Sequence, residues 1–202
     1  GVYLSPLYGL LTSLLCGGLL LSVRFWHEEK QKIVLRRAFS RYVSPEVVKQ
    51  ISKRQGDLLA GENRELSILF TDIRGFTSLS ESLSPQDVVQ LLNRYFTPMT
   101  AIVRNRKGTL DKFIGDALMA FWNAPLDVPN HPALAVDAAL CMQEQLEALN
   151  VEIEASFGIR LAMGAGIHTG QAYVGNMGSD DLINYTLIGD NVNLASRLEG
   201  LC

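Results

Sequence analysis

The sequence has 202 residues, of which 48% are hydrophobic and 19% are charged, and its formal net charge is −3. This length accommodates one domain of ordinary size with an additional segment. The apolar content excludes a disordered or collagen-like chain, and the small negative charge excludes a protein that binds nucleic acid by bulk electrostatic attraction. The three cysteines are widely spaced and form no Cys/His cluster, so neither a zinc site nor a disulfide framework is expected.

Charge is distributed unevenly along the chain. Residues 1–23 carry no charged side chain, residues 24–64 have a net charge of +5, and residues 65–202 have a net charge of −8. An acidic region of this kind needs bound cations if its substrate is an anion.

Residues 2–23 are apolar or small throughout, which predicts a transmembrane helix. A helix of about 22 residues spans roughly 33 Å, enough for a bilayer core. Several basic residues follow at once, from Arg24 to Arg37, so the chain after residue 24 is expected on the cytoplasmic side. A signal peptide would have its basic residues before the apolar run, and a buried core helix of this length without charge is unusual. We therefore expect a protein anchored in the inner or plasma membrane, with the rest of the chain in the cytoplasm.

The remaining residues show an alternation of helical and extended patterns. Residues 24–63 are expected to form cytoplasmic coupling helices at 25–43 and 45–53 and a linker. The elements predicted after them are a strand at 66–73, a helix at 85–106, strands at 109–114 and 117–122, a helix at 132–156, strands at 160–169, 171–175 and 182–188, and a helix at 190–199. This order predicts an α+β domain with a mainly antiparallel sheet.

Two aspartates stand where strands end. Asp72 closes the predicted buried strand, and Asp116 follows Gly115 at the tip of a predicted hairpin. Two such carboxylates on adjacent strands can share Mg²⁺, which prefers oxygen ligands. Each aspartate alone is more typical of a turn or helix cap. The Gly-containing turn after Asp72 has backbone amides that suit phosphate groups, although glycine turns are common.

Four strings together carry a specific resemblance. LFTDIRGFTSLSE, LDKFIGDALMAFW, GIHTGQAYVGNMG and YTLIGDNVNLASRLEG, with their spacing, resemble the class III nucleotide cyclase catalytic domain over residues 64–201. The resemblance implies a ferredoxin-like, palm-like fold for residues 64–202, incomplete at its C-terminus. The apolar run, the basic helix and the RYVSPEVV junction resemble bacterial membrane-bound cyclases, many of which have a CHASE-type sensor domain upstream.

The resemblance implies a role for each matching residue. Asp72, the Ile73 carbonyl and Asp116 match the ligands of two metal ions, Mg²⁺ or Mn²⁺, in each active site. Gly75, Phe76 and Thr77 match the turn whose amides hold the phosphates. Lys112 matches the residue that binds adenine N1. Thr186 matches the residue that accepts a hydrogen bond from the adenine amino group. Asn193 and Arg197 match the catalytic pair that orients the ribose and stabilises the pentavalent phosphorus.

Elementary chemistry agrees with these roles. A Lys donates hydrogen bonds and cannot accept them, so Lys112 suits adenine N1 and not the N1–H of guanine. Asn193 and Arg197 are four residues apart and share one helix face. Arginine is always protonated and forked, which suits charge on a phosphorane.

In the family, the metal carboxylates come from one subunit and the other site residues from its partner. Because this chain has both sets, the resemblance implies a symmetric homodimer with two sites. The predicted function is an adenylate cyclase that converts ATP to cyclic AMP and pyrophosphate and transmits a signal across the membrane. No nucleic acid is expected as a partner.

Three other classes of protein share parts of this pattern. A guanylate cyclase would usually have Glu and Cys where Lys112 and Thr186 stand. A non-catalytic signalling module with the cyclase fold would not need an intact set of metal and catalytic residues. A GGDEF-type synthase would need a GGDEF string, which is absent. Two departures bear on activity: Gln171 replaces an Arg of the animal enzymes, and a phosphate-binding Lys is expected beyond residue 202, so the fragment alone is expected to be impaired.

Overall fold

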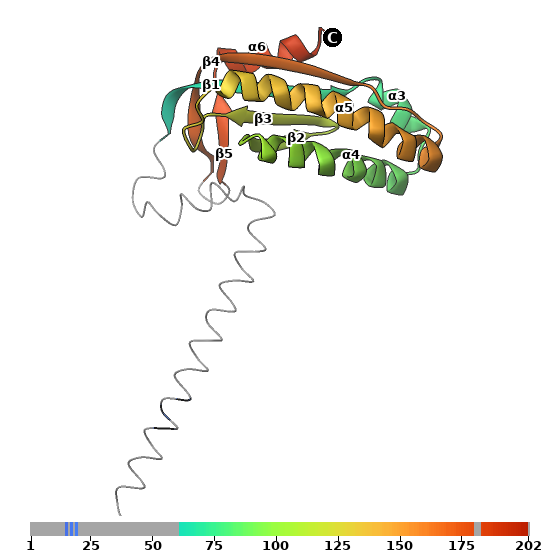
Figure 1. Cartoon of the computed structure of the whole chain (residues 1–202), viewed down its shortest axis with the longest axis horizontal. Helices are drawn as coiled ribbons and strands as arrows, with labels where there is room; N and C mark the ends of the chain where they lie inside the picture. Colours follow the sequence, from blue (N-terminus) through green and yellow to red (C-terminus); the bar gives the residue numbers. More distant parts are fainter. Residues whose placement is uncertain (1–14, 16, 18, 20–60, 180–182, 202) are drawn as a thin grey trace, which may run out of the picture. The chain divides into compact units, whose positions relative to one another are not determined.

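The computed structural model describes residues 61–179 and 183–201, together with Leu15, Gly17 and Leu19, which are helical. The chain divides into two units, Gly1–Pro45 and Glu46–Cys202, and the following account concerns the second (Figure 1). Apart from these three residues and 61–63, the predicted transmembrane helix at 2–23 and the coupling region at 24–63 lie outside the described residues. Within the described ranges, none of the helices combines the length and apolar character that a membrane span requires.

The described part of the second unit contains a five-stranded antiparallel sheet and four helices. Its elements are β1 (Glu62–Ile73), α3 (Phe76–Glu81), α4 (Pro85–Asn105), β2 (Thr109–Ile114), β3 (Ala117–Trp122), α5 (His131–Phe157), β4 (Met163–Gly178), β5 (Ile183–Ile188) and α6 (Asp190–Glu199). The strands lie in the order β2-β3-β1-β4-β5, and every neighbouring pair is antiparallel. The predicted α+β class with an antiparallel sheet is therefore confirmed.

Local sequence signals account for the boundaries of several elements. Ser84 caps α4, accepting a hydrogen bond from the Asp87 amide at 3.2 Å, and Pro85 occupies the first turn, as the Ser-Pro pattern predicts. Gly115, with a φ of 65°, turns the β2–β3 hairpin. Helix α5 ends at Gly158, whose φ of 69° is the left-handed conformation typical of a helix terminus.

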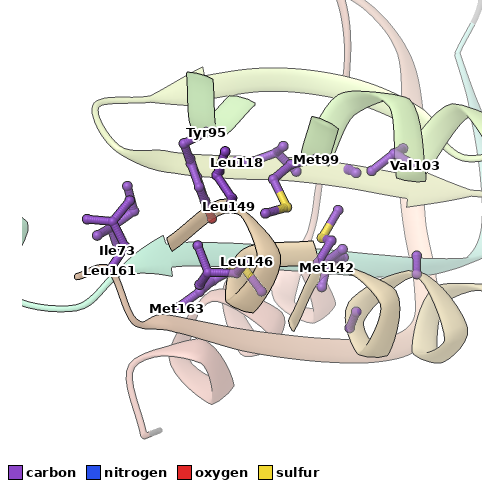
Figure 2. Packing of buried hydrophobic residues seen from close by; sticks show 14 of the residues in the cluster. Ile73, Tyr95, Met99, Val103, Leu118, Met142, Leu146, Leu149, Leu161 and Met163 are labelled. Carbon is purple, nitrogen blue, oxygen red and sulfur yellow. The ribbon is translucent and has the colours of Figure 1, made fainter. Parts of the chain in front are cut away.

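Alternating side chains of the sheet build two cores, one on each face. The larger core lies beneath α4 and α5, where Ile73 and Leu118 meet Tyr95 and Met99 of α4 and Leu146 of α5 (Figure 2). The opposite face packs against α6, and its buried residues are Leu66, Ile68, Met119, Phe121, Ala124, Ala172, Val174, Leu187, Val192 and Ala195. Successive side chains of a strand point to opposite faces of the sheet. Alternate residues of β1 and β3 therefore pack toward α4 and α5 on one face and toward α6 on the other.

The structure differs from the sequence-based expectations in two places, one a wrong prediction after α5 and the other a helix after β1 that was not predicted. The strands expected at 160–169 and 171–175 are one continuous strand, β4, because it pairs with β1 without interruption from Met163 to Val174 and Gly170 takes its place opposite Leu66. Residues 160–162 precede the strand, where Leu161 exchanges two hydrogen bonds with the Asn150 side chain. The helix α3 was not predicted, since the glycine turn before it dominates the local pattern.

A glycine permits the close packing of α6 on β4. A Cβ atom at Gly166 would lie 2.2 Å from the Glu199 backbone nitrogen and 2.5 Å from the Ala195 carbonyl oxygen. Both are backbone atoms of α6, so no side chain can move aside to make room. The position of α6, which carries two predicted site residues, therefore depends on Gly166.

We predict that Gly166→Ala lowers the free energy of unfolding by about 1–3 kcal/mol, the usual range for overpacking. Thermal or urea unfolding measures this change. Gly200→Ala is the matched control, because a Cβ atom there would meet its nearest neighbour at 3.6 Å and the φ of Gly200 is −65°. Equal stability of the two variants would contradict the packing argument.

Candidate active site

The two predicted metal-binding aspartates lie side by side. Asp72 is the penultimate residue of β1, and Asp116 lies in the turn between β2 and β3. Because β1 pairs with β3 in the register Thr71 opposite Leu118, the end of β1 meets the hairpin turn. The Ile73 amide donates to Asp116 Oδ2 at 3.3 Å, and the carboxyl groups of Asp116 and Asp72 interact directly. The structure thus brings together all three predicted metal ligands.

The electrostatics of this pair favour a cation. Burial and, to a smaller extent, the neighbouring carboxyl of Asp72 together raise the pKa of Asp116 to about 6. Closely spaced carboxylate oxygens fit hard divalent ions such as Mg²⁺ or Mn²⁺. In residues 61–179 and 183–201, no group of three or more His, Cys, Asp or Glu side chains forms a complete metal site. The remaining ligands would be the Ile73 carbonyl, water and phosphate oxygens of a bound nucleotide.

The predicted phosphate turn follows directly. Gly75 has a φ of 68° and occupies the N-cap position of α3, while Phe76 and Thr77 form the first turn of that helix. The first amides of a helix have no partner within it and remain available to other acceptors. Phe76 packs against the larger core, which anchors the turn beside Asp72.

Arg74, which the sequence analysis did not single out, connects this turn to α6. Its guanidinium group lies 2.8 Å from Glu199 Oε1 and donates to the Glu199 carbonyl at 2.7 Å. Its backbone amide donates to the Ala162 carbonyl at 2.8 Å. In the sequence, only the position of Arg74 between Asp72 and Gly75 indicated a role for it. Its partner Glu199 is 125 residues away, so their contact could not be predicted from local sequence.

The two predicted base-binding residues are joined through a third residue. The Thr186 hydroxyl on β5 donates to Asp111 Oδ2 at 2.7 Å, and Lys112 Nζ lies 3.5 Å from Asp111 Oδ1. The Asp111 side chain is 1% exposed, and its burial raises its pKa. Asp111 is the second residue that the sequence analysis missed, because β2 and β5 are the opposite edges of the sheet order.

The predicted catalytic pair lies on α6. Asn193 and Arg197 are both exposed. Asn191 holds the start of α6 against β4. Its Oδ1 lies 2.8 Å from His168 Nε2, and its Nδ2 donates a hydrogen bond to the Gln171 carbonyl at 2.8 Å. Among the described residues, no hydrogen bond or ion pair joins the Asp72–Asp116 pair to Asn193, Arg197, Lys112 or Thr186. One chain therefore presents two separate groups of predicted site residues.

Comparisons with known proteins identify the family. Residues 59–202 match the model of the adenylate and guanylate cyclase catalytic domain. Adenylate cyclase 1 of Rhizobium meliloti is 40% identical over 164 residues, which cover 81% of this chain and 25% of that protein. Two crystal structures are similar, each 38% identical over 71% of this chain: the adenylyl cyclase CyaB from P. aeruginosa (TM-score 0.69, 74% of that chain) and the guanylyl cyclase Cya2 (TM-score 0.68, 73% of that chain).

The chain belongs to the adenylate and guanylate cyclase catalytic domain family, as its motifs predicted. It spans about a quarter of the length of the curated relative above. The similar scores of an adenylyl and a guanylyl cyclase mean that overall likeness does not identify the base of the substrate.

The raised pKa of Asp116 gives a prediction about stability. A carboxyl whose pKa is higher in the folded than in the unfolded chain stabilises the fold at low pH, and this contribution is lost as the pH rises from about 4 to about 6. We predict that Asp72→Asn, without metal, raises Tm at neutral pH by up to about 2–4 °C, which corresponds to about 1 kcal/mol after allowance for solvent screening. At about pH 4 the gain should vanish.

Thermal unfolding with and without Mg²⁺ measures this effect. Glu144→Gln, which removes a charge from an exposed position of α5, is the control and should not change Tm. Added Mg²⁺ should stabilise the wild type more than Asp72→Asn. A lower Tm of Asp72→Asn at neutral pH in the absence of metal would contradict the repulsion argument.

Proposed function

We propose that the protein containing this chain is an adenylate cyclase that converts ATP to 3′,5′-cyclic AMP and pyrophosphate. The observation that carries the proposal is the juxtaposition of Asp72 and Asp116 at the end of β1, in a domain of the cyclase family. Two acidic side chains beside a turn of free amides suit a substrate that brings several phosphates and divalent cations to the same place.

The residues of the chain have distinct parts in this reaction. The ribose 3′-hydroxyl loses its proton to solvent, its oxygen attacks the α-phosphorus in line to form a new O3′–P bond, and the bond to the β-phosphate oxygen breaks to release pyrophosphate. Asp72, Asp116 and the Ile73 carbonyl would hold two divalent ions, which acidify the 3′-hydroxyl and neutralise charge on the leaving phosphates. The amides of Gly75, Phe76 and Thr77 hold the phosphates.

The transition state and the base are handled by the other group of residues. Asn193 orients the ribose, and the permanently charged guanidinium of Arg197 stabilises the negative charge on the phosphorane. Lys112 donates to adenine N1, and Thr186 accepts from the adenine amino group. Guanine presents N1–H and O6 at these positions, so the pair favours ATP over GTP.

A homodimer accounts for the separation of the two groups. Asn193 and Arg197 are exposed, away from any described contact with the carboxylate pair, and would act on a nucleotide held by a second chain. Large apolar side chains are also exposed close in sequence to Lys112, Thr186 or Asn193, as is typical of an interface: Phe113, Ile114, Ile183, Ile188 and Leu194. We further propose that residues 2–23 anchor the dimer in the inner or plasma membrane, with the catalytic region in the cytoplasm and signals transmitted through the membrane.

Production of cyclic AMP by the full-length protein in detergent or nanodiscs tests this function. ATP with Mg²⁺ or Mn²⁺ should yield cyclic AMP, and Asp72→Ala should reduce the rate by on the order of 10²-fold or more, because metal stabilisation of the transition state is worth several kcal/mol. Glu144→Gln should retain the wild-type rate. Cyclic GMP as the main product would favour a guanylate cyclase, and nucleotide binding without turnover would favour a non-catalytic signalling module.

A further inference from the structure

We propose that Asp111 is a positioning residue that makes Thr186 and Lys112 selective for adenine. The inference rests on the proposed function, since it concerns how the same site distinguishes ATP from GTP. Neither the motifs nor the resemblance assigned a role to Asp111, which acts through its two neighbours and does not itself touch the nucleotide.

A β-bulge places Asp111 where it can act. Leu110 lies opposite Ala120 and Lys112 lies opposite Met119, so Asp111 is an extra residue without a partner on β3. A bulge redirects the side chains on its two sides, and bulges are common next to active sites. Here Leu110 packs against the core beneath α4 and α5, while Lys112 lies opposite a residue of the core on the other face.

The buried carboxylate is held entirely by donors. It accepts from the Thr186 hydroxyl at 2.7 Å and from the Leu187 backbone amide, and Lys112 Nζ lies 3.5 Å from its other oxygen. A buried charge is tolerated when it is paired and hydrogen-bonded in this way. The carboxylate thus connects the two sheet edges, β2 and β5.

The direction of the Thr186 hydrogen bond is the feature that matters. A hydroxyl has one proton to donate and two lone pairs that accept, whereas an ionised carboxylate only accepts. Asp111 therefore takes the one Thr186 proton, and the hydroxyl oxygen is left with lone pairs only. Such an oxygen accepts from the amino group of adenine and has nothing to offer O6 of guanine.

The same carboxylate also lies beside Lys112. Lys112 Nζ lies 3.5 Å from Asp111 Oδ1, and a lysine side chain only donates hydrogen bonds and so matches adenine N1. The two contacts to the base thus comprise one donor, Lys112, and one acceptor, Thr186, a pattern that adenine matches and guanine does not. A site with a fixed, buried hydrogen-bond pattern rejects the wrong base because its polar groups are left unpaired.

The test is the ratio of kcat/KM for ATP to kcat/KM for GTP, measured on the full-length protein. The amide of the Asp111→Asn side chain can donate to Thr186, which frees the Thr186 proton for guanine O6. We expect this variant to lower the ratio by about tenfold or more, whereas Asp111→Glu, which preserves an acceptor, should keep the preference for ATP even if both rates fall. Glu144→Gln should match the wild type.

A merely structural role for Asp111 would lower both activities together and leave the ratio unchanged, and that result for Asp111→Asn would overturn the inference. If Asp111→Asn does not fold, Thr186→Val tests the same contact from β5 and should lower the ratio similarly; an unchanged ratio would again overturn it. A wild type that forms no cyclic AMP from ATP would instead refute the proposed function. If the wild type prefers ATP and Asp111→Asn has the same ratio of kcat/KM values as the wild type, only the role of Asp111 would be refuted and the proposed function would stand.

Discussion

Asp72 and Asp116 place two carboxyl groups in contact where β1 meets the β2–β3 turn, and their burial and mutual repulsion raise the pKa of Asp116 to about 6. The rest of the domain holds this unfavourable pair in place. Strand β1 is paired on both sides, with β3 and β4, and both of its faces are covered by cores. In the proposed function, a bound cation would turn the repulsion into attraction, so binding of metal and nucleotide would recover the stability lost at the site.

The motifs predicted most of the catalytic region because its signals are local. Ser84 and Pro85 mark the start of α4, Gly115 marks the hairpin turn, and the Asp72–Asp116 contact follows from two strand ends that share a sheet. What could not be predicted depends on partners far apart in the sequence. Strand β4 continues through Gly170 because β1 pairs with it, and Asp111 finds Thr186 75 residues away across the sheet order.

Overall similarity in this fold does not distinguish enzymes that use ATP from enzymes that use GTP. The adenylyl cyclase CyaB and the guanylyl cyclase Cya2 are equally identical to this chain, at 38%, and have nearly the same TM-scores. Family and fold therefore define the chemistry of cyclisation, while a few polar groups define which nucleotide is used. In this chain Asp111 links Thr186 to Lys112, and we propose that the position of the Thr186 hydroxyl proton decides between ATP and GTP.

In the proposed homodimer, each active site combines the carboxylate pair of one chain with α6 of another. Co-expression of Asp72→Ala and Arg197→Ala forms of the full-length protein, each with its own affinity tag, allows the mixed dimer to be isolated and its cyclic AMP production measured. We predict that each variant alone is inactive and that the mixed dimer has about half of the wild-type activity, because one of its two sites is intact. An inactive mixed dimer, with both chains folded and associated, would contradict it.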